Sequence, residues 1–236
     1  MRIGILGSGL MGGKLGTIFA RAGHEVVFSY ARSERKLKRL AQEAAGKARP
    51  GTPREAAQEA DVVLLAVHWS RIRDVLKQAG GLSGKIIVSC SLPMNADDTA
   101  LVVAHTSSGA EKLARMTPKA RVVSAFNTVP SEVLFGVFGA RRRTARPSLV
   151  YCGDDSRSKG VAAGLIRDVG FEPMDLGPLR MARYTEPFAL LVAQLAYGGR
   201  DGPELAYRFE RINKLAWRWR TSRSGTAHAI RMKPSE

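Results

Sequence analysis

Three glycines near the start of the chain have the spacing of a phosphate-binding loop. Gly7, Gly9 and Gly12 form the pattern G-x-G-x-x-G after the apolar run MRIGIL, where a helical pattern begins. The first glycine permits a sharp turn, the second lets the backbone approach a pyrophosphate, and the third lets the helix pack against the strand. The free N–H groups of such a helix attract an anion. The spacing therefore predicts a dinucleotide site rather than a structural turn, formed by Gly7, Ser8, Gly9, Leu10, Met11 and Gly12.

The end of the second expected strand indicates which dinucleotide is bound. NAD-binding proteins carry an aspartate or glutamate about 20 residues beyond the glycines, where it binds the ribose hydroxyls. Here Ser29 takes that place, and the next carboxylate is Glu34. A carboxylate would repel a 2′-phosphate, whereas arginine forms charge-assisted hydrogen bonds to it. We therefore predict NADP(H), with its phosphate held by hydroxyls and cations among Ser29, Tyr30, Arg32, Ser33, Arg35 and Lys36.

Two further segments follow expected core strands. They are Ala66, Val67, His68 and Trp69 after one strand, and Asn127 and Thr128 after another. Ligands of open parallel sheets lie across the carboxyl ends of the strands, so both segments should border the nicotinamide half of the cofactor. His68 and Asn127 are the candidate catalytic residues. A packing or cofactor-contact role stays open for His68, because Trp69 lies beside it.

These segments are positioned by alternating strands and helices. We expect strands over 1–7, 24–30, 61–67, 85–90, 121–126, 148–155 and 171–177, and helices over 10–22, 33–45, 69–79 and 156–170. Thr52, Pro53 and Glu55 have the pattern of a capping box that starts another helix. Such alternation is typical of right-handed β–α–β units, so the predicted fold is α/β, a doubly wound Rossmann-type, mostly parallel sheet.

The pattern becomes helical from Pro178 onward, over Arg183–Tyr197 and Pro203–Arg220. We divide the chain into an NADP-binding domain (1–178), a small helical region on the acceptor side (179–220) and a basic tail that we expect to be disordered (221–236). Two helices alone bury little apolar surface. We therefore expect them to pack on the sheet domain and across the two-fold interface of a homodimer, with a purely intramolecular cap as the alternative.

Composition bounds the class of protein. The 236 residues carry a net charge of +16, which attracts polyanions. No helix-turn-helix, RNP or zinc-finger pattern accompanies this charge, so we do not expect nucleic-acid binding. We expect no membrane segment, because no apolar run approaches the roughly 20 residues that a membrane span needs, and no signal peptide. Cys90 and Cys152 lie in strand-like stretches without metal-ligand spacing, which favours no metal site and a reducing, cytoplasmic location.

The chain resembles the NADPH-dependent reductases of the deazaflavin coenzyme F420. The matching segments are MRIGILGSGLMGGKLGTIFARAGHEVVFS, DVVLLAVHW, FNTVP, VYCGDD and DLGPL, in that order over most of residues 1–197. The resemblance implies hydride transfer between the NADPH nicotinamide and a second ring, which needs stacking and alignment more than an acid or base. Archaeal members of this family carry histidine at the position of Asn127. The acceptor side that the resemblance implies is Val129, Pro130, Leu179, Arg180, Met181 and Arg183.

Three functions follow from these observations. The leading hypothesis is an NADPH-dependent oxidoreductase that uses coenzyme F420 as co-substrate. A second keeps NADPH but reduces a small imine, ketone or flavin, which would require a proton donor such as His68, Tyr184 or Tyr197. A third, based on the basic tail, is a non-enzymatic NADPH sensor or polyanion-binding module.

Overall fold

Eight strands form one sheet in the computed structural model, which describes residues 1–200 and 202–211. The strand order is β3-β2-β1-β4-β5-β6-β7-β8, and all neighbours are parallel except β6 and β7. The prediction of a doubly wound, mostly parallel sheet is thereby confirmed. The strands are β1 (Arg2–Leu6), β2 (Glu25–Ser29), β3 (Ala48–Pro50), β4 (Val62–Leu65), β5 (Ile86–Ser89), β6 (Arg121–Ser124), β7 (Ser148–Gly153) and β8 (Glu172–Asp175).

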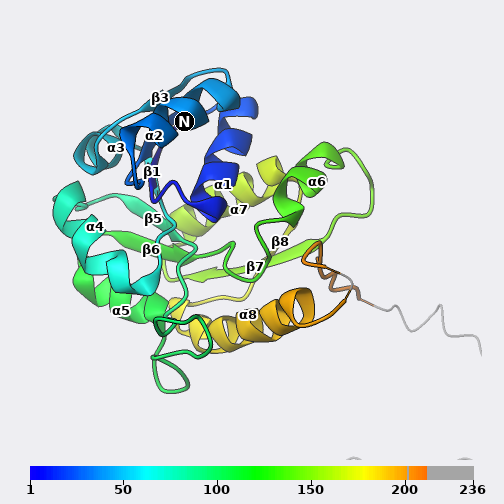
Figure 1. Cartoon of the computed structure of the whole chain (residues 1–236). Helices are drawn as coiled ribbons and strands as arrows, with labels where there is room; N and C mark the ends of the chain where they lie inside the picture. Colours follow the sequence, from blue (N-terminus) through cyan, green and yellow to red (C-terminus); the bar gives the residue numbers. More distant parts are fainter. Residues whose placement is uncertain (201, 212–236) are drawn as a thin grey trace, which may run out of the picture.

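Helices cover both faces of the sheet and enclose two apolar cores (Figure 1). One core contains residues of α1, α2, α6 and α7, and the other contains residues of α3, α4, α5 and the start of α8. Within the described residues, no helix has the length and apolarity that crossing a membrane requires. The helices are α1 (Leu10–Arg21), α2 (Glu34–Ala44), α3 (Pro53–Glu59), α4 (Ile72–Ala79), α5 (Gly109–Met116), α6 (Val133–Gly139), α7 (Ser156–Val169) and α8 (Ala182–Tyr197), with 3₁₀ turns η1 (Trp69–Arg71) and η2 (Leu179–Met181).

The helix starts around β2 and β3 follow from local sequence. Ser33 accepts a hydrogen bond from the Lys36 N–H and caps α2. Thr52 and Glu55 form the predicted capping box at the start of α3. These short-range contacts fix the turns after β2 and β3, and both turns lie at the edge of the sheet where the strands end.

The predicted second C-terminal helix is wrong over Pro203–Arg211, which has no helical structure. Its backbone instead pairs with β7: the Ser148 N–H donates to the Tyr207 carbonyl at 2.8 Å, and the Phe209 N–H donates to Ser148 Oγ at 2.9 Å. The Tyr207 ring lies edge-on to Phe188 at 5.1 Å between centroids. These tertiary contacts outweigh the helical pattern of the segment. The rest of the predicted helix, 212–220, and the basic tail, 221–236, lie outside the described residues.

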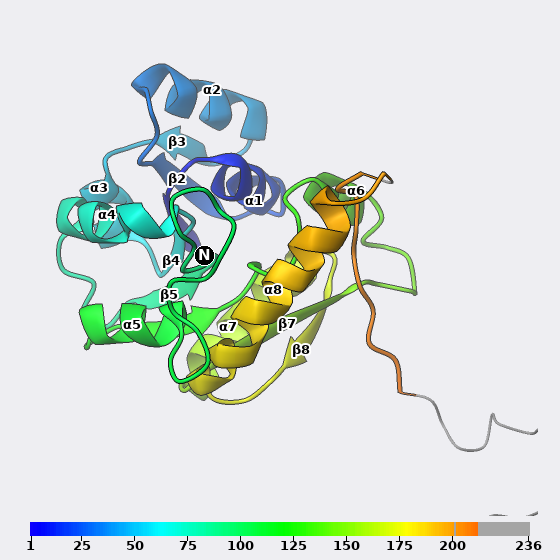
Figure 2. The same ribbon diagram turned by 60° about the horizontal axis from the view of Figure 1, so that its bottom comes forward.

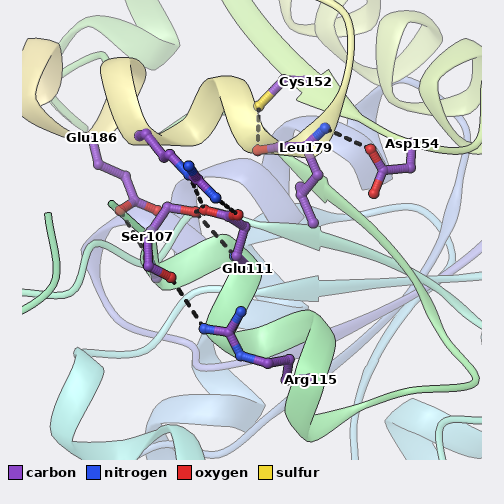
Figure 3. A network of polar contacts seen from close by, with 10 residues as sticks. Ser107, Glu111, Arg115, Cys152, Asp154, Leu179 and Glu186 are labelled. Carbon is purple, nitrogen blue, oxygen red and sulfur yellow. Dashed lines mark hydrogen bonds and ion pairs between the residues drawn. The ribbon is translucent and has the colours of Figure 1, made fainter. Parts of the chain in front are cut away.

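Two polar contacts, one of them fully buried, hold the start of α8 against α5 (Figure 3). The carboxylate of Glu186, which is only 1% exposed, accepts hydrogen bonds from the N–H groups of Gly109 at 2.8 Å and Ala110 at 3.0 Å. Arg183 forms a two-pronged ion pair with Glu111 at 2.9 and 2.6 Å. Burial raises the pKa of Glu186 to about 7. Glu186 therefore caps a helix that is distant in sequence.

We expect the Glu186→Gln substitution to flatten the pH dependence of stability. The pKa of Glu186 rises from 4.5 to about 7 on folding, so the folded state retains a proton that the unfolded state releases. This contribution is fully present below pH 4.5 and is lost as the pH rises through 7, and it amounts to roughly 3 kcal/mol. Urea unfolding at several pH values between about 4.5 and 7.5 should show a smaller decline in the variant.

The matched control is Glu43→Gln, at an exposed glutamate of α2. It should follow the pH dependence of the unchanged protein. An identical decline in the Glu186→Gln variant would contradict the prediction.

Candidate functional site

The glycine loop between β1 and α1 has no room for side chains at two positions. Gly7 has a φ of +110°, and a Cβ there would lie 2.4 Å from the Ala66 carbonyl oxygen. A Cβ on Gly12 would lie 2.0 Å from the Gly7 carbonyl oxygen. Gly9, in contrast, faces open space, with no atom within 4 Å of a Cβ built there. The loop thus packs tightly on its inner side and leaves its outer side free for a ligand, as the spacing predicts.

The amino end of α1 is suited to an anion. Gly9 is the N-cap residue, no side chain caps the helix, and its first turn contains no acidic residue. Its first N–H groups and the positive end of its dipole therefore face the open side of the loop.

The glycine loop is hydrogen-bonded to the end of β2. The Gly7 N–H donates to the Ser29 carbonyl, and the Ser8 N–H donates to the Tyr30 carbonyl, both at 3.2 Å. Ser29 is fully buried, and its Oγ donates to the Ile5 carbonyl at 2.7 Å. The prediction that Ser29 holds the phosphate is therefore wrong, because its hydroxyl is directed into the sheet.

A cavity of about 1240 Å³ opens beside the loop. Its walls come from the end of β2, the turn before α3, and the segment from β4 into α4. The strand order reverses here, with β1 between β2 and β4, and dinucleotides bind at such a point. The predicted cofactor residues that line this cavity are Gly7, Ser8, Gly9, Leu10, Tyr30, Arg32, Lys36, Ala66, Val67 and His68.

The cavity is lined by both cations and carboxylates. Each carboxylate is engaged by a neighbouring group: Glu34 pairs with Lys38, and Glu55 accepts hydrogen bonds from Thr52. The Thr52 hydrogen bonds lower the pKa of Glu55. The lining also holds three cations, Arg32, Lys36 and Arg71, whose side chains have no hydrogen-bond or ion-pair partner within residues 1–200 and 202–211.

Asp74 of α4 is the third carboxylate of the cavity. The Tyr30 hydroxyl donates to it at 2.5 Å, and the Gln78 amide donates at 3.2 Å. These hydrogen bonds, that of Tyr30 above all, lower the pKa of Asp74. Tyr30 has a φ of +55°, a conformation that few residues other than glycine adopt. The bond to Asp74 and the contact with the glycine loop hold it there.

Arg71 and Asp74 were missed by the sequence reasoning, which considered only the end of β2 as the phosphate-binding region. The signal that could have revealed them is their position in the first helical turns after β4, the strand next to β1 in the sheet. Helices that follow this strand start at the same edge of the sheet as the glycine loop. Any cation in their first turns is thus a candidate contact.

His68 is held by hydrogen bonds at both ring nitrogens. Its Nδ1 accepts from the Ser70 N–H at 3.2 Å, while Nε2 lies 3.1 Å from the Asn95 carbonyl and 3.2 Å from Asp98 Oδ1. A carbonyl oxygen only accepts, so we assign the proton to Nε2. His68 thus ties the loop after β5 to the end of β4.

The remaining predicted cofactor residues do not line the cavity. Met11 and Gly12 belong to the first turn of α1, and Ser33 caps α2. Asn127 is buried and its amide donates to Ser124 Oγ at 3.1 Å. Trp69, the first residue of η1, is partly buried against the core that contains residues of α3, α4 and α5. The hydroxyl of Thr128 bonds to that of Tyr207 at 2.8 Å.

The predicted acceptor side forms a separate region. Val129, Pro130 and Leu179 are buried, and Arg183 is paired with Glu111, so none of them presents a free polar group. Arg180 is exposed and Met181 half-buried.

Lys14 was not among the predicted site residues. Its ammonium group donates to the carbonyl and hydroxyl oxygens of Ser131 at 3.1 and 3.2 Å. It thereby joins α1 to the segment that follows β6.

The two tyrosines considered as proton donors lie on α8. Tyr184 is 68% exposed on the outer face of the helix. The Tyr197 hydroxyl donates to Glu132 at 2.8 Å, and burial together with this hydrogen bond raises the pKa of Tyr197 to about 12. Its proton is therefore held at physiological pH.

Comparison with known proteins agrees with this geometry. Residues 2–93 match the family model described as NADP oxidoreductase, coenzyme F420-dependent. Metalloreductase STEAP3 of Rattus norvegicus is 31% identical over 189 residues, which are 80% of this chain but only 36% of that protein. The family resemblance is thereby confirmed over residues 2–93. The match of residues 2–93 to an NADP oxidoreductase family agrees with the prediction of NADP(H) as cofactor.

Solved structures show the same fold. A candidate F420-dependent NADP-reductase from Arthrobacter sp. FB24 has a TM-score of 0.78 at 24% identity, covering 89% of this chain and 100% of that one. A hypothetical protein from Sinorhizobium meliloti has a TM-score of 0.65 at 25% identity, covering 89% and 96%. The reductive aminase of Aspergillus terreus, solved with NADPH and ethyl levulinate, has a TM-score of 0.60 at 18% identity, covering 82% and 61%.

Alanine at Gly12 should lower stability, whereas alanine at Gly9 should leave it nearly unchanged. We expect Gly12→Ala to lower the free energy of unfolding by about 2 kcal/mol or more, because its Cβ would meet the Gly7 carbonyl. Gly9→Ala faces open space and should leave stability within about 0.5 kcal/mol, yet weaken NADPH binding, because its methyl group occupies the ligand's side of the loop. Urea unfolding and calorimetric titration measure the two effects. Equal stability of both variants would contradict this assignment.

Removing a cation from the cavity should weaken the 2′-phosphate contact selectively. We expect Arg32→Ala and Arg71→Ala each to raise the dissociation constant for NADPH by about tenfold to a hundredfold, and that for NADH by less than about threefold. Arg39→Ala is the matched control, because Arg39 is exposed and pairs with Glu43 on the same helix as Lys36. A parallel loss for both nucleotides would show that these arginines do not select the phosphate.

Proposed function

Because residues 2–93 form a domain of the coenzyme F420-dependent NADP oxidoreductase family, we propose that this protein transfers a hydride between NADP(H) and coenzyme F420. The observation that supports NADP(H) most directly is the set of unpartnered cations, Arg32, Lys36 and Arg71, around a cavity that starts at the glycine loop. A third phosphate is the group that such a set would recognise.

The chain's own residues would bind and orient the cofactor. The N–H groups at the start of α1 hold the pyrophosphate, and the cations hold the 2′-phosphate. Val67 and His68 border the cavity where it leads from the glycine loop toward the ends of β4 and β5. NADPH, when bound, supplies a hydride from its nicotinamide ring. The protein contributes alignment of the two rings and exclusion of water.

The three candidate proton donors, His68, Tyr184 and Tyr197, favour an acceptor that needs no protein acid. Both nitrogens of His68 are engaged, by Ser70 and by Asn95. The Tyr197 proton is donated to Glu132, and Tyr184 faces away from the body of the chain. An imine or ketone reductase would place a free proton donor beside the nicotinamide. A deazaflavin requires stacking more than protonation by a side chain, and the net charge of +16 suits an anionic coenzyme of that kind.

We propose that the reaction takes place in the cytoplasm. Cys90 and Cys152 are both free thiols, and burial raises the pKa of each. A reducing compartment keeps such thiols in this state.

Anaerobic spectroscopy tests the acceptor. Mixing the protein with NADPH and oxidised F420 should bleach the deazaflavin absorbance band in repeated turnovers, and NADH should do so much more slowly. The Gly9→Asp variant is the matched control. Its side chain has room in the fold, but its carboxylate would repel the pyrophosphate, so we expect a loss of at least about a hundredfold in rate.

Reduction of a flavin, imine or ketone by NADPH with no change in the deazaflavin band would overturn the F420 proposal while retaining NADPH. Absence of NADPH binding by calorimetry would overturn both parts and favour a polyanion-binding role.

A further inference from the structure

Strands β6 and β7 separate at the carboxyl edge of the parallel strands. Their antiparallel register runs only through Val123 with Gly153 and Ser124 with Cys152. Because β6 ends there, the first residues of β7 lie beyond its carboxyl end. The N–H groups on this side of β7 therefore need another partner, since an unpaired buried N–H group is costly.

Tyr207, near the end of the described residues, supplies partners for these N–H groups. Its carbonyl oxygen accepts from the Ser148 N–H at 2.8 Å, and its hydroxyl oxygen accepts from the Val150 N–H at 3.2 Å. The same hydroxyl bonds to the hydroxyl of Thr128, which follows β6, at 2.8 Å. Figure 2 shows the segment of Tyr207, in orange, where it passes the start of β7. Tyr207 thus joins the two strands where they no longer pair with each other.

The chain after β6, residues 126–131, forms a strained turn that we call the β6 turn. Phe126 is fully buried and has a φ of +65°, which is rare for a bulky side chain. Such a conformation persists only where its surroundings fix it. Three side-chain contacts hold the turn: Asn127 with Ser124, Thr128 with Tyr207, and Ser131 with Lys14. Of these partners, Tyr207 is the one that comes from beyond α8.

The β6 turn lies next to the strand ends that border the cofactor cavity. The Ala125 N–H donates to the Ser89 carbonyl at 3.0 Å, and Ser91 Oγ donates to the Val67 carbonyl at 2.7 Å. The ends of β6, β5 and β4 are thus connected, and Val67 lines the cavity. Lys14 also ties the turn to the helix that begins at the glycine loop. We therefore expect the turn to border the nicotinamide half of a dinucleotide whose pyrophosphate lies at this loop.

We propose that Tyr207 is a positioning residue for hydride transfer. Its hydroxyl fixes Thr128 and with it the β6 turn, against which the nicotinamide ring is aligned with the acceptor. Tyr207 acts through the turn and does not itself touch the reacting atoms. A misplacement of about 1 Å can reduce the rate of a reaction about a hundredfold, so a single hydrogen bond at this point has a large effect. The inference rests on the proposed function, because it requires NADP(H) in the cavity.

The ring and the hydroxyl of Tyr207 have separate partners. The ring lies edge-on to Phe188 at 5.1 Å and to Phe209 at 5.3 Å between centroids. Burial raises the pKa of Tyr207, so the hydroxyl keeps its proton at physiological pH and can donate it to Thr128. Phenylalanine at this position would retain the aromatic contacts and the backbone pairing with β7, and would remove only the hydroxyl. The Tyr207→Phe variant should therefore fold.

Kinetics and binding of the full-length Tyr207→Phe variant separate alignment from affinity. We expect kcat for F420 reduction by NADPH to fall at least about tenfold, while KM for NADPH stays within about threefold. The dissociation constant of 2′-phospho-ADP-ribose, which lacks the nicotinamide, should change less than about twofold in calorimetry, because the glycine loop is untouched. Tyr151→Phe is the matched control and should retain kcat. Tyr151 lies in β7, and its hydroxyl has no hydrogen-bond partner among the described residues.

Fluorescence of bound NADPH provides a readout that does not depend on the acceptor. Time-resolved anisotropy measures how freely the reduced nicotinamide ring moves in the site. We expect greater ring mobility in Tyr207→Phe and no change in Tyr151→Phe. Thr128→Val should reproduce the effect of Tyr207→Phe, and the double variant should be no worse than either, because both substitutions remove the same hydrogen bond.

Unchanged kcat and unchanged ring mobility in Tyr207→Phe would overturn the proposal. An equal loss of affinity for 2′-phospho-ADP-ribose would also overturn it, since it would indicate a general structural effect. Additive effects of the Tyr207 and Thr128 substitutions would overturn the link through Thr128. If the unchanged protein does not reduce F420 but ring mobility still depends on Tyr207, the F420 proposal alone fails and the role of Tyr207 is supported. Absence of NADPH binding would overturn both.

Discussion

The close approach of α1 to the ends of β1 and β4 is the constraint on which the rest of the site depends. Neither Gly7 nor Gly12 has room for a Cβ, since carbonyl oxygens of Ala66 and of the loop itself occupy that space. This contact brings the amino end of α1 to the point where the strand order reverses. The end of β2, the turn before α3 and the start of α4 then meet around one cavity. The electrostatic character of the site follows, because each of these segments contributes charged side chains.

Charge pairing inside the cavity determines what it can recognise. Acidic and basic residues are equally numerous in its lining, so composition alone would predict a neutral site. The carboxylates stay ionised, but neighbouring donors occupy them: Glu55 closes a capping box, and Asp74 is held by Tyr30 and Gln78. The cations keep their charge unpaired within the described part of the chain. Recognition of an additional phosphate thus arises from which charges are engaged by neighbours, rather than from which residues are present.

Contacts between residues close in sequence could be predicted, whereas contacts between residues far apart in sequence could not. The glycine loop, the Ser33 cap and the capping box of Thr52 each depend on a few consecutive residues, and all are present. Ser29 was misassigned because alternation along β2 turns its hydroxyl into the sheet. Asp74 and the Glu186 cap on α5 depend on pairs 44 and 76 or 77 residues apart, which no short pattern reveals.

The nucleotide site and the region around α8 differ in how far local sequence determines their chemistry. The nucleotide half uses backbone N–H groups at a fixed turn, so its ligand class follows from glycine spacing alone. The region around α8 depends on side-chain contacts between distant elements, such as that of Arg183 with Glu111. Because Arg183 is paired in this way, it is not free to bind an anionic acceptor, as the sequence analysis expected. Substitutions can therefore alter the acceptor side and the outer face of α8 without disturbing the nucleotide site. A common cofactor domain combined with varied acceptors is the expected consequence.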